Sequence, residues 1–271
     1  MKAKLRNVFR IMGKLTPPII TDIYQYLFIP KYGWDGDYKT FEEAKSHSGG
    51  YDHAEILERV KKAALKVKSG AAVYERDSVI FDDIHYLWPL LAGLMWIAAN
   101  NKGRLNVLDF GGSLGSSYFQ NKKFLEGIDV KWSVVEQEHF VKIGREFITN
   151  ERLRFYESIE MCIKNSLPDV IIFSSVLQYL DKPYEFIETV LSYKFEYILI
   201  DRTQFTLNKE RITVQKVPPS IYEASYPCWI FNENKFFGVF KKDYELIEKF
   251  DAGDSGIGDF AFKGAILKRR S

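Results

Sequence analysis

The chain has 271 residues, of which 46% are hydrophobic and 27% charged, an ordinary balance for a globular protein with one large domain. Its formal net charge is +2, from 38 Lys and Arg against 36 Asp and Glu, so no charge excess indicates a nucleic-acid partner. The two cysteines, Cys162 and Cys228, and the four histidines show no metal-ligand spacing. We therefore expect no metal site and a reducing, cytoplasmic location.

The first segment, from Met1 to about Leu27, mixes Lys and Arg with Leu, Val, Phe, Ile and Met. Such a basic amphipathic arm suits an anionic surface, which predicts peripheral contact at the inner face of a membrane. The alternative is a helix that packs on the domain itself or on a second copy of the chain. The sequence leaves this choice open.

Residues 1–100 are expected to form a helical extension that packs on or caps the core. One helix is predicted from about Asp52 to near Gly70. A second is predicted from about Leu87 to Asn100, with Pro89 in its first turn. Because this second helix is apolar nearly all round, we expect it to be buried.

From residue 101 onward, short apolar runs alternate with amphipathic ones. Five strands separated by four helices predict a parallel sheet with helices on both faces. Two further strands, 244–250 and 261–267, are expected to form an antiparallel hairpin at the sheet edge. The expected α/β fold of residues 101–271 is therefore Rossmann-like, doubly wound and mostly parallel, with seven strands. The expected strands are 106–110, 131–135, 153–156, 169–173 and 196–200, and the expected helices are 116–126, 138–148, 159–164 and 184–191.

The segment from about 203 to 240 interrupts the alternation, because it contains three prolines and many aromatic residues. An insertion after the fifth strand is expected to lie over the carboxyl ends of the strands. Ligands bind at that edge in open α/β sheets.

A glycine-rich loop, Gly111-Gly-Ser-Leu-Gly115, follows the first strand and precedes a helix. Glycines there permit positive φ and close approach of the backbone to a ligand. The helix N-terminus behind them favours polar or anionic groups. The loop alone indicates a nucleotide-like ligand and does not identify it.

Two acidic residues help to distinguish between the possible nucleotide-like ligands of this loop. Glu136 closes the second strand about 20 residues beyond Gly115, the distance at which a carboxylate holds a ribose diol. Asp109, just before the glycines, would repel the phosphates of a dinucleotide but suits the cationic amino-acid end of S-adenosylmethionine. The dinucleotide pattern also needs a Gly where Ser113 stands. Both departures favour S-adenosylmethionine over NAD.

Three segments match, in order, motifs of class I S-adenosylmethionine-dependent methyltransferases: Val-Leu-Asp-Phe-Gly-Gly-Ser-Leu-Gly (107–115), Val-Val-Glu-Gln (134–137) and Ser-Ser-Val-Leu-Gln-Tyr-Leu (174–180). With Tyr-Glu-Arg-Asp (74–77), Asp-Arg-Thr (201–203) and Tyr-Pro-Cys-Trp-Ile-Phe (226–231), the chain resembles a bacterial methyltransferase family often encoded among surface-polysaccharide biosynthesis genes. The resemblance covers most of the chain from about Trp34 onward.

The resemblance implies a role for each matching residue in cofactor binding. Asp109 and the loop residues Gly111, Gly112, Ser113 and Gly115 would hold the amino-acid part. Glu136 would hold the ribose, with Gln137 beside the adenine and Ser158 near the adenine amine. Ser174 and Ser175 would flank the methionine side. These ten residues, all from strand ends and the loops that follow them, form the predicted cofactor site.

The acceptor side is less defined. Asp201 and Arg202, directly after the fifth strand, and Tyr179 and Tyr226 are the candidate catalytic residues. The alternatives are a local ion pair for the first two and packing for the tyrosines. The predicted reaction is O- or N-methylation of a small-molecule or glycan acceptor. An NAD-dependent sugar oxidoreductase or epimerase, and a non-catalytic methyltransferase-like subunit, stay open as alternatives.

Overall fold

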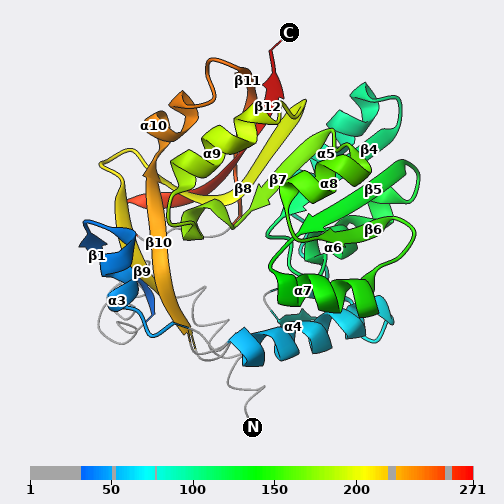
Figure 1. The fold of residues 1–271 in the computed structure, drawn as a ribbon, viewed down its shortest axis with the longest axis horizontal. Helices are drawn as coiled ribbons and strands as arrows, with labels where there is room; N and C mark the ends of the chain where they lie inside the picture. Colours follow the sequence, from blue (N-terminus) through cyan, green and yellow to red (C-terminus); the bar gives the residue numbers. More distant parts are fainter. Residues whose placement is uncertain (1–31, 51–52, 77, 219–223, 254–257, 271) are drawn as a thin grey trace, which may run out of the picture.

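A ten-stranded mixed sheet forms the centre of the computed structural model, which describes residues 32–50, 53–76, 78–218, 224–253 and 258–270 (Figure 1). Along the sheet the strands follow the order β1-β9-β10-β8-β7-β4-β5-β6, and β12 and then β11 attach to β8.

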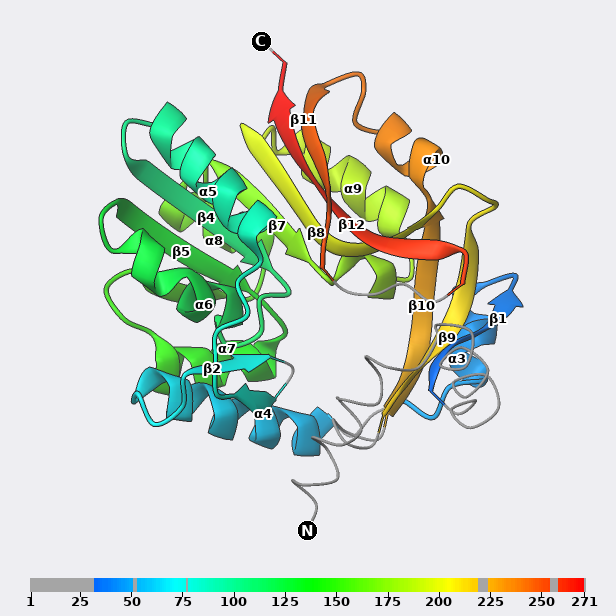
Figure 2. The same cartoon turned by 180° about the vertical axis from the view of Figure 1, so that it is seen from behind.

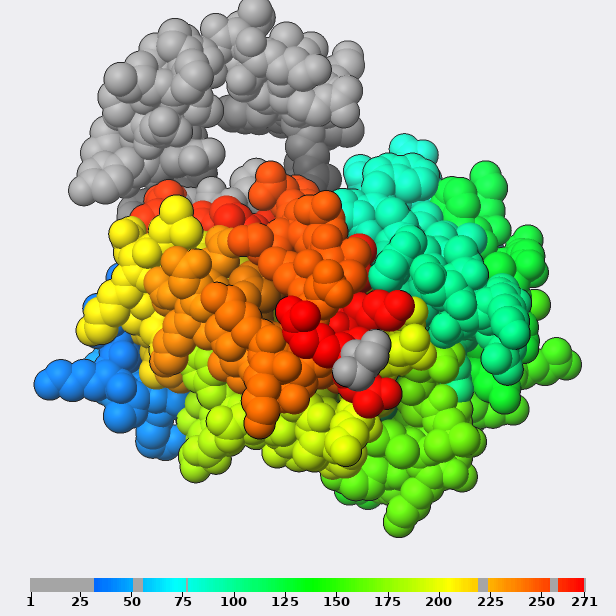
Figure 3. All heavy atoms as spheres, turned by 90° about the horizontal axis from the view of Figure 1, so that it is seen from above, coloured from blue at the N-terminus to red at the C-terminus, as the bar shows by residue number. Residues whose placement is uncertain are grey.

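Seven of these strands confirm the predicted doubly wound architecture. The five parallel ones are β4 (Arg104–Phe110), β5 (Asp129–Val135), β6 (Leu153–Tyr156), β7 (Val170–Ser174) and β8 (Tyr197–Thr206). The other two, β11 (Tyr244–Asp251) and β12 (Phe260–Arg269), form the predicted antiparallel hairpin. In the space-filling view, the hairpin and α10 form one continuous orange and red part of the surface (Figure 3).

Helices cover both faces of the sheet, as the alternation predicts. The helices α5 (Trp88–Asn100) and α6 (Ser116–Leu125) lie on one face, and α8 (Ile159–Ser166) and α9 (Pro183–Ser192) lie on the other (Figures 1 and 2). The expected helix 138–148 is α7 (Glu138–Ile143), which continues as a π-helical segment, η1 (Gly144–Ile148). Among the described residues, no helix combines the length and apolarity needed to span a membrane.

Two separate hydrophobic clusters follow from the two covered faces. Neighbouring strand residues alternate between them, because successive side chains of a strand point to opposite faces. Val107 and Leu199 pack with α5 and α6, whereas Leu108 and Ile198 pack with α8 and α9. Coverage on both sides explains why these strands read as continuous apolar runs.

The fifth parallel strand is longer than the predicted 196–200. All ten residues of β8 except Arg202 are buried, and the strand pairs with β7 on one side and with β12 on the other. Pairing with β12 continues past the end of β7, so Asp201 and Arg202 lie within the strand and not after it. At this point two residues of β8 oppose the single residue Gly264 of β12, which is a β-bulge.

The expected insertion at about 203–240 therefore begins later than predicted, and it is built mostly from strands. Its β9 (Arg211–Val217) and β10 (Ala224–Asn232) pair antiparallel, and α10 (Glu233–Gly238) follows. The outer strand, β1 (Gly33–Tyr38), comes from the N-terminal extension and pairs with β9. Figures 1 and 2 show these three strands together at one side of the molecule.

The N-terminal extension is accordingly not purely helical, which corrects the prediction. After β1 come α3 (Phe41–Ser46) and the predicted helix, α4 (His53–Lys68). The short strands β2 (Tyr74–Arg76) and β3 (Val79–Phe81) then form a hairpin. Pairing of β1 with the distant β9, and of β2 with the neighbouring β3, replaces helix here. The basic arm of residues 1–27 lies outside the described residues.

Candidate functional site

The strand order defines a switch point between β4 and β7. From β4 the chain proceeds to β5 and β6 in one direction, whereas β7 leads to β8 in the other. The loops that follow β4 and β7 diverge there, and open α/β folds bind ligands outside the carboxyl ends of the strands at such a point. The predicted glycine loop and the predicted Ser174–Ser175 pair follow these two strands.

The glycine loop adopts the left-handed backbone that its sequence suggests. Gly111, Ser113 and Gly115 have φ values of 71°, 54° and 89°. Ser113 therefore adopts the left-handed conformation that a glycine usually supplies. Gly111 N–H donates to the Val135 carbonyl at 2.9 Å, which ties the loop to the end of β5.

Asp109 lies directly beneath this loop and is 1% exposed. The indole N–H of Trp132 donates to Asp109 Oδ2 at 3.1 Å. A Cβ at Gly112 would come within 2.5 Å of the same carboxyl group, so only glycine fits above it. Burial raises the pKa of Asp109 to about 7; the hydrogen bond from Trp132 opposes this rise, and the neighbouring Glu136 carboxylate adds to it.

Glu136 is held at the end of β5 by backbone donors. Ser113 N–H donates to Glu136 Oε1 at 3.3 Å, and Gln137 N–H donates to Glu136 Oε2 at 2.8 Å. Burial raises the pKa of Glu136, and these two hydrogen bonds lower it. A carboxylate has about four lone-pair sites, so acceptor capacity remains for a pair of hydroxyls. The neighbouring Gln137 side chain is exposed.

Ser174, Asp201 and Arg202 meet where β7 and β8 run side by side. Ser174 Oγ donates to Asp201 Oδ2 at 2.7 Å, and Arg202 Nε lies 3.4 Å from the same oxygen. The local ion pair, one of the two alternatives for Asp201 and Arg202, is therefore present. Ser175 and Arg202 have φ values of 56° and 47°. One of them directly follows β7 and the other lies within β8, and left-handed residues other than glycine concentrate at functional sites.

The two candidate tyrosines contact each other between η2 and strand β10 of the insertion. Tyr179 lies in η2 (Leu177–Tyr179), and its ring meets that of Tyr226 edge-on with centroids 5.2 Å apart. The Tyr179 hydroxyl donates to Gln215 Oε1 on β9 at 3.0 Å. The fully buried Gln178 links this pair to the bulge, because its Nε2 donates to Ser175 Oγ and to the Arg202 carbonyl.

Ser158 has a local structural contact. Its hydroxyl accepts from Met161 N–H at 3.2 Å and caps α8. Trp229, on the insertion, donates its indole N–H to the Leu180 carbonyl and stacks on Phe231, so it belongs to the core of the insertion.

Sequence reasoning missed three buried polar contacts of the site. Trp132 reads as a core residue in β5, yet its indole holds Asp109. Glu75 is 3% exposed, and the hydroxyl of Ser116 in the first turn of α6 donates to its carboxylate. Gln178 links two loops. Glu75 and Gln178 had a sequence signal, since they lie in the segments Tyr-Glu-Arg-Asp (74–77) and Ser-Ser-Val-Leu-Gln-Tyr-Leu (174–180), whereas Trp132 had none.

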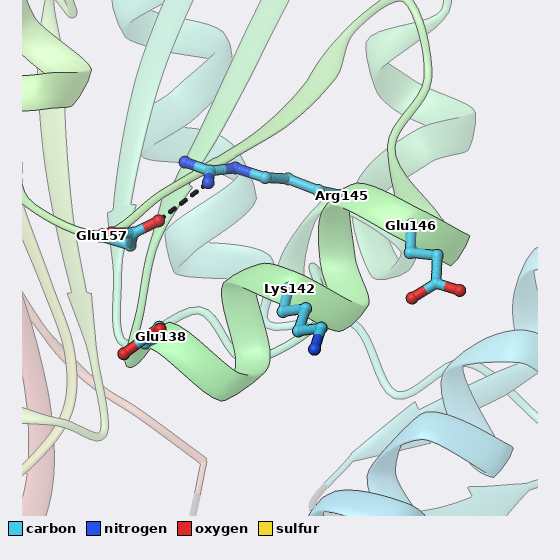
Figure 4. A pocket seen from close by; sticks show the side chains of 5 residues that line it. All are labelled: Glu138, Lys142, Arg145, Glu146 and Glu157. Atoms are coloured by element: carbon cyan, nitrogen blue, oxygen red, sulfur yellow. Dashed lines mark hydrogen bonds and ion pairs between the residues drawn. The ribbon is translucent and has the colours of Figure 1, made fainter.

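A separate hollow lies over α7 and η1, lined by Glu138, Lys142, Arg145, Glu146 and Glu157 (Figure 4). Arg145 reaches Glu157 at 2.8 Å, and both side chains are more than 40% exposed. Solvated ion pairs of this kind contribute little binding energy. This hollow does not include the residues at the switch point between β4 and β7. Within the described ranges, no three His, Cys, Asp or Glu side chains are grouped as metal ligands would be.

No protein-family model and no curated protein matches this chain. Among solved structures, a SAM-dependent methyltransferase from Leishmania major aligns with a TM-score of 0.47 and 14% identity, over 88% of this chain and 96% of that one. The 1,6-didemethyltoxoflavin-N1-methyltransferase of Burkholderia thailandensis, with S-adenosylhomocysteine bound, gives 0.46 and 13%, over 88% and 94%. The N-terminal domain of EvdMO1, in the presence of S-adenosylhomocysteine and D-fucose, gives 0.45 and 13%, over 82% and 98%. Similarities this distant concern the fold and carry no inference about the ligand.

Proposed function

We propose that this chain is an S-adenosylmethionine-dependent methyltransferase that acts on an oxygen or nitrogen of a sugar or glycan intermediate in the cytoplasm. The observation that carries the proposal is the pair of carboxylates around the glycine loop. Asp109 lies directly beneath the loop, and Glu136 accepts from the loop backbone at Ser113.

This arrangement favours a cationic ligand over a dinucleotide. A pyrophosphate would rest on the loop 111–115 and on the N-terminus of α6. Asp109 beneath Gly112 and Glu75 at Ser116 place two buried carboxylates at those positions. Like charge there would oppose phosphate and attract an ammonium group. The NAD-dependent alternative gains no support from this geometry.

Three residues at the ends of β4, β5 and β7 would each bind a different part of the cofactor. Asp109 would face the α-ammonium group, and Glu136 would accept from the ribose hydroxyls. Ser174, held by Asp201 and Arg202, would border the methionine side. When bound, S-adenosylmethionine would supply a sulfonium methyl group, and the protein would contribute positioning and, for an oxygen nucleophile, a path for the proton.

The acceptor would lie against the insertion, and its class is argued from the side chains there. Tyr179, Tyr226 and Gln215 combine aromatic rings with hydroxyl and amide groups, a composition that suits a sugar. Asp201 is already engaged by Ser174 and Arg202. We therefore propose that Asp201 and Arg202 organise the site, and that the two tyrosines contact the acceptor. The resemblance to the polysaccharide-linked family supports the same acceptor class.

Calorimetric titration of the full chain with S-adenosylmethionine, S-adenosylhomocysteine and NAD tests the proposal. We expect both adenosyl compounds to bind and NAD not to bind. Binding of NAD alone would overturn the proposal, and binding of none of the three would favour a non-catalytic subunit. Production of S-adenosylhomocysteine in the presence of nucleotide sugars then tests the acceptor class.

A matched pair of variants addresses Glu136. Glu136→Ala should weaken S-adenosylhomocysteine binding by about 1–3 kcal/mol, which is roughly 5- to 150-fold. Glu138→Ala removes an exposed carboxylate two residues further along, in the first turn of α7, and should leave the affinity unchanged. Equal affinities for the two variants would refute the ribose role.

The basic arm of residues 1–27 is proposed to contact an anionic membrane surface or a second copy of the chain. Co-sedimentation of the full chain with anionic and with neutral vesicles distinguishes these partners. Binding to anionic vesicles alone supports the membrane, and a dimer in sedimentation analysis supports the second copy.

A further inference from the structure

The Trp132 side chain connects the apolar core to the candidate cofactor site. It lies on β5 and is completely buried. Strands β4 and β5 pair in parallel with Asp109 opposite Val134, so Trp132 stands two residues earlier on the same face as Val134. From there its indole N–H reaches Asp109 Oδ2 at 3.1 Å. The carboxyl group is thus enclosed between the indole below and Gly112 above.

Charged groups around Asp109 come from two further elements. Glu136 stands at the end of β5, and Asp201 and Arg202 stand at the bulge of β8. Two of these groups are acids and one is a cation. Within the described part of the chain, Arg202 is the cation that acts on Asp109, and it is already paired with Asp201 at 3.4 Å. The indole N–H is the neutral donor that favours its ionised form.

We infer that Trp132 is a positioning residue of the cofactor site, whose indole N–H orients the Asp109 carboxylate and favours its ionised form for a cationic group of the ligand. This inference rests on the proposed function, since the ligand's ammonium group is taken to face Asp109. Trp132 itself would not touch the ligand, because Asp109 lies between them.

Coupling between ligand binding and protonation follows from this arrangement. Burial raises the pKa of Asp109 to about 7, so below that pH the free protein holds a proton on this carboxyl group. A cation beside Asp109 favours the ionised form, so binding expels that proton. Affinity should then rise as the pH increases toward 7 and level off above it. Loss of the indole N–H should move this plateau to higher pH, because the hydrogen bond lowers the pKa of Asp109.

The test is calorimetric titration with S-adenosylhomocysteine between about pH 5.5 and pH 8.5, in buffers of different ionisation enthalpy. The wild type should release up to one proton per ligand below pH 7. Trp132→Phe should bind about tenfold more weakly at pH 7 and approach the wild-type affinity at the upper end of the range. Asp109→Asn should lose the Asp109-dependent part of the proton release.

Trp96→Phe is the matched control, because Trp96 packs against the same hydrophobic cluster and meets Tyr197 edge-on. It should not move the pH at which the affinity levels off. A uniform loss of affinity for Trp132→Phe at every pH would mean a packing role only and would overturn the inference. Failure of the wild type to bind S-adenosylhomocysteine would instead overturn the proposed function.

A second measurement needs no variant at position 132. In protein labelled with ¹⁵N-tryptophan, the indole N–H resonance of Trp132 should shift with a midpoint near pH 7 in the free protein. It should not shift over this range once S-adenosylhomocysteine is bound. A resonance that is insensitive to pH in the free protein would overturn the link between Trp132 and Asp109, whatever the ligand proves to be.

Discussion

Replacing Gly112 by alanine is the sharpest steric perturbation of the candidate site. The backbone of Gly112 does not have positive φ, so alanine suits its conformation and only the added methyl group matters. That methyl carbon would lie 2.5 Å from both Cγ and Oδ2 of Asp109, whereas ordinary van der Waals contact begins at 3.4 Å. Roughly 1 Å of movement is therefore required. Because the indole of Trp132 holds the carboxyl group from below, either their hydrogen bond breaks or the loop lifts.

The expected cost has two parts. Overpacking of this kind lowers the free energy of unfolding by about 1–3 kcal/mol. A displaced Asp109 would also lose its contact with a cationic ligand, worth about 1.5–3 kcal/mol, so S-adenosylhomocysteine should bind about 10- to 150-fold more weakly. Calorimetric titration measures the second effect and thermal unfolding the first.

Gly127→Ala serves as the control for this substitution. Gly127 also lacks a positive φ, and a Cβ there would meet no atom within 4 Å. This variant should keep the wild-type affinity and melting temperature. If Gly112→Ala matched it in both measurements, the placement of Asp109 beneath the loop would be refuted.

Two further predictions concern the hairpin that supports the site. Gly264→Ala should lower the melting temperature by several degrees. The new Cβ would lie 2.2 Å from the Phe250 ring and 2.5 Å from the Ile200 carbonyl oxygen. An unchanged melting curve would contradict this packing. Arg211 donates to both carboxylate oxygens of Asp259 and holds the pKa of that carboxyl at about 2. Since this folded-state pKa lies below the usual 3.8, the pair stabilises the protein above that pH and loses its effect as the pH falls toward 2. Asp259→Asn should therefore lower stability at neutral pH, by less than about 1 kcal/mol for so exposed a pair. In urea unfolding the loss should become smaller as the pH falls toward 2, and equal losses at both pH values would contradict the ion pair.

The sheet and the loop on which the site depends could be predicted from the sequence because their signals are local. Alternating apolar runs mark β4, β5 and β7, and each switch to helical spacing follows a glycine or a polar residue. The number of residues from Gly115 to Glu136 is set by one helix and one strand, so it does not depend on the rest of the fold. The glycine loop, the two acids and the Ser174–Ser175 pair therefore gather at the predicted edge of the sheet.

The acceptor side could not be predicted in the same way. The end of β8 depends on β12, and the bulge at Asp201 and Arg202 depends on Gly264, which lies far along the chain. Pairing of β1 with β9 likewise joins the N-terminal extension to the insertion. Periodicity within a segment cannot indicate which distant strand will satisfy its hydrogen bonds.

By itself the sequence determined the order of the elements from β4 to β8, the glycine loop and the two carboxylates on which the proposal of a cationic cofactor rests. Hydrophobic periodicity and backbone conformational limits act over a few residues, so these features are encoded locally. Only the tertiary structure decided what each carboxylate faces. Asp109 contacts Trp132 and Gly112, and Asp201 contacts Ser174 and Arg202. Desolvation and hydrogen bonding by such neighbours set the pKa of a carboxyl group, and the chain brings these neighbours together only on folding.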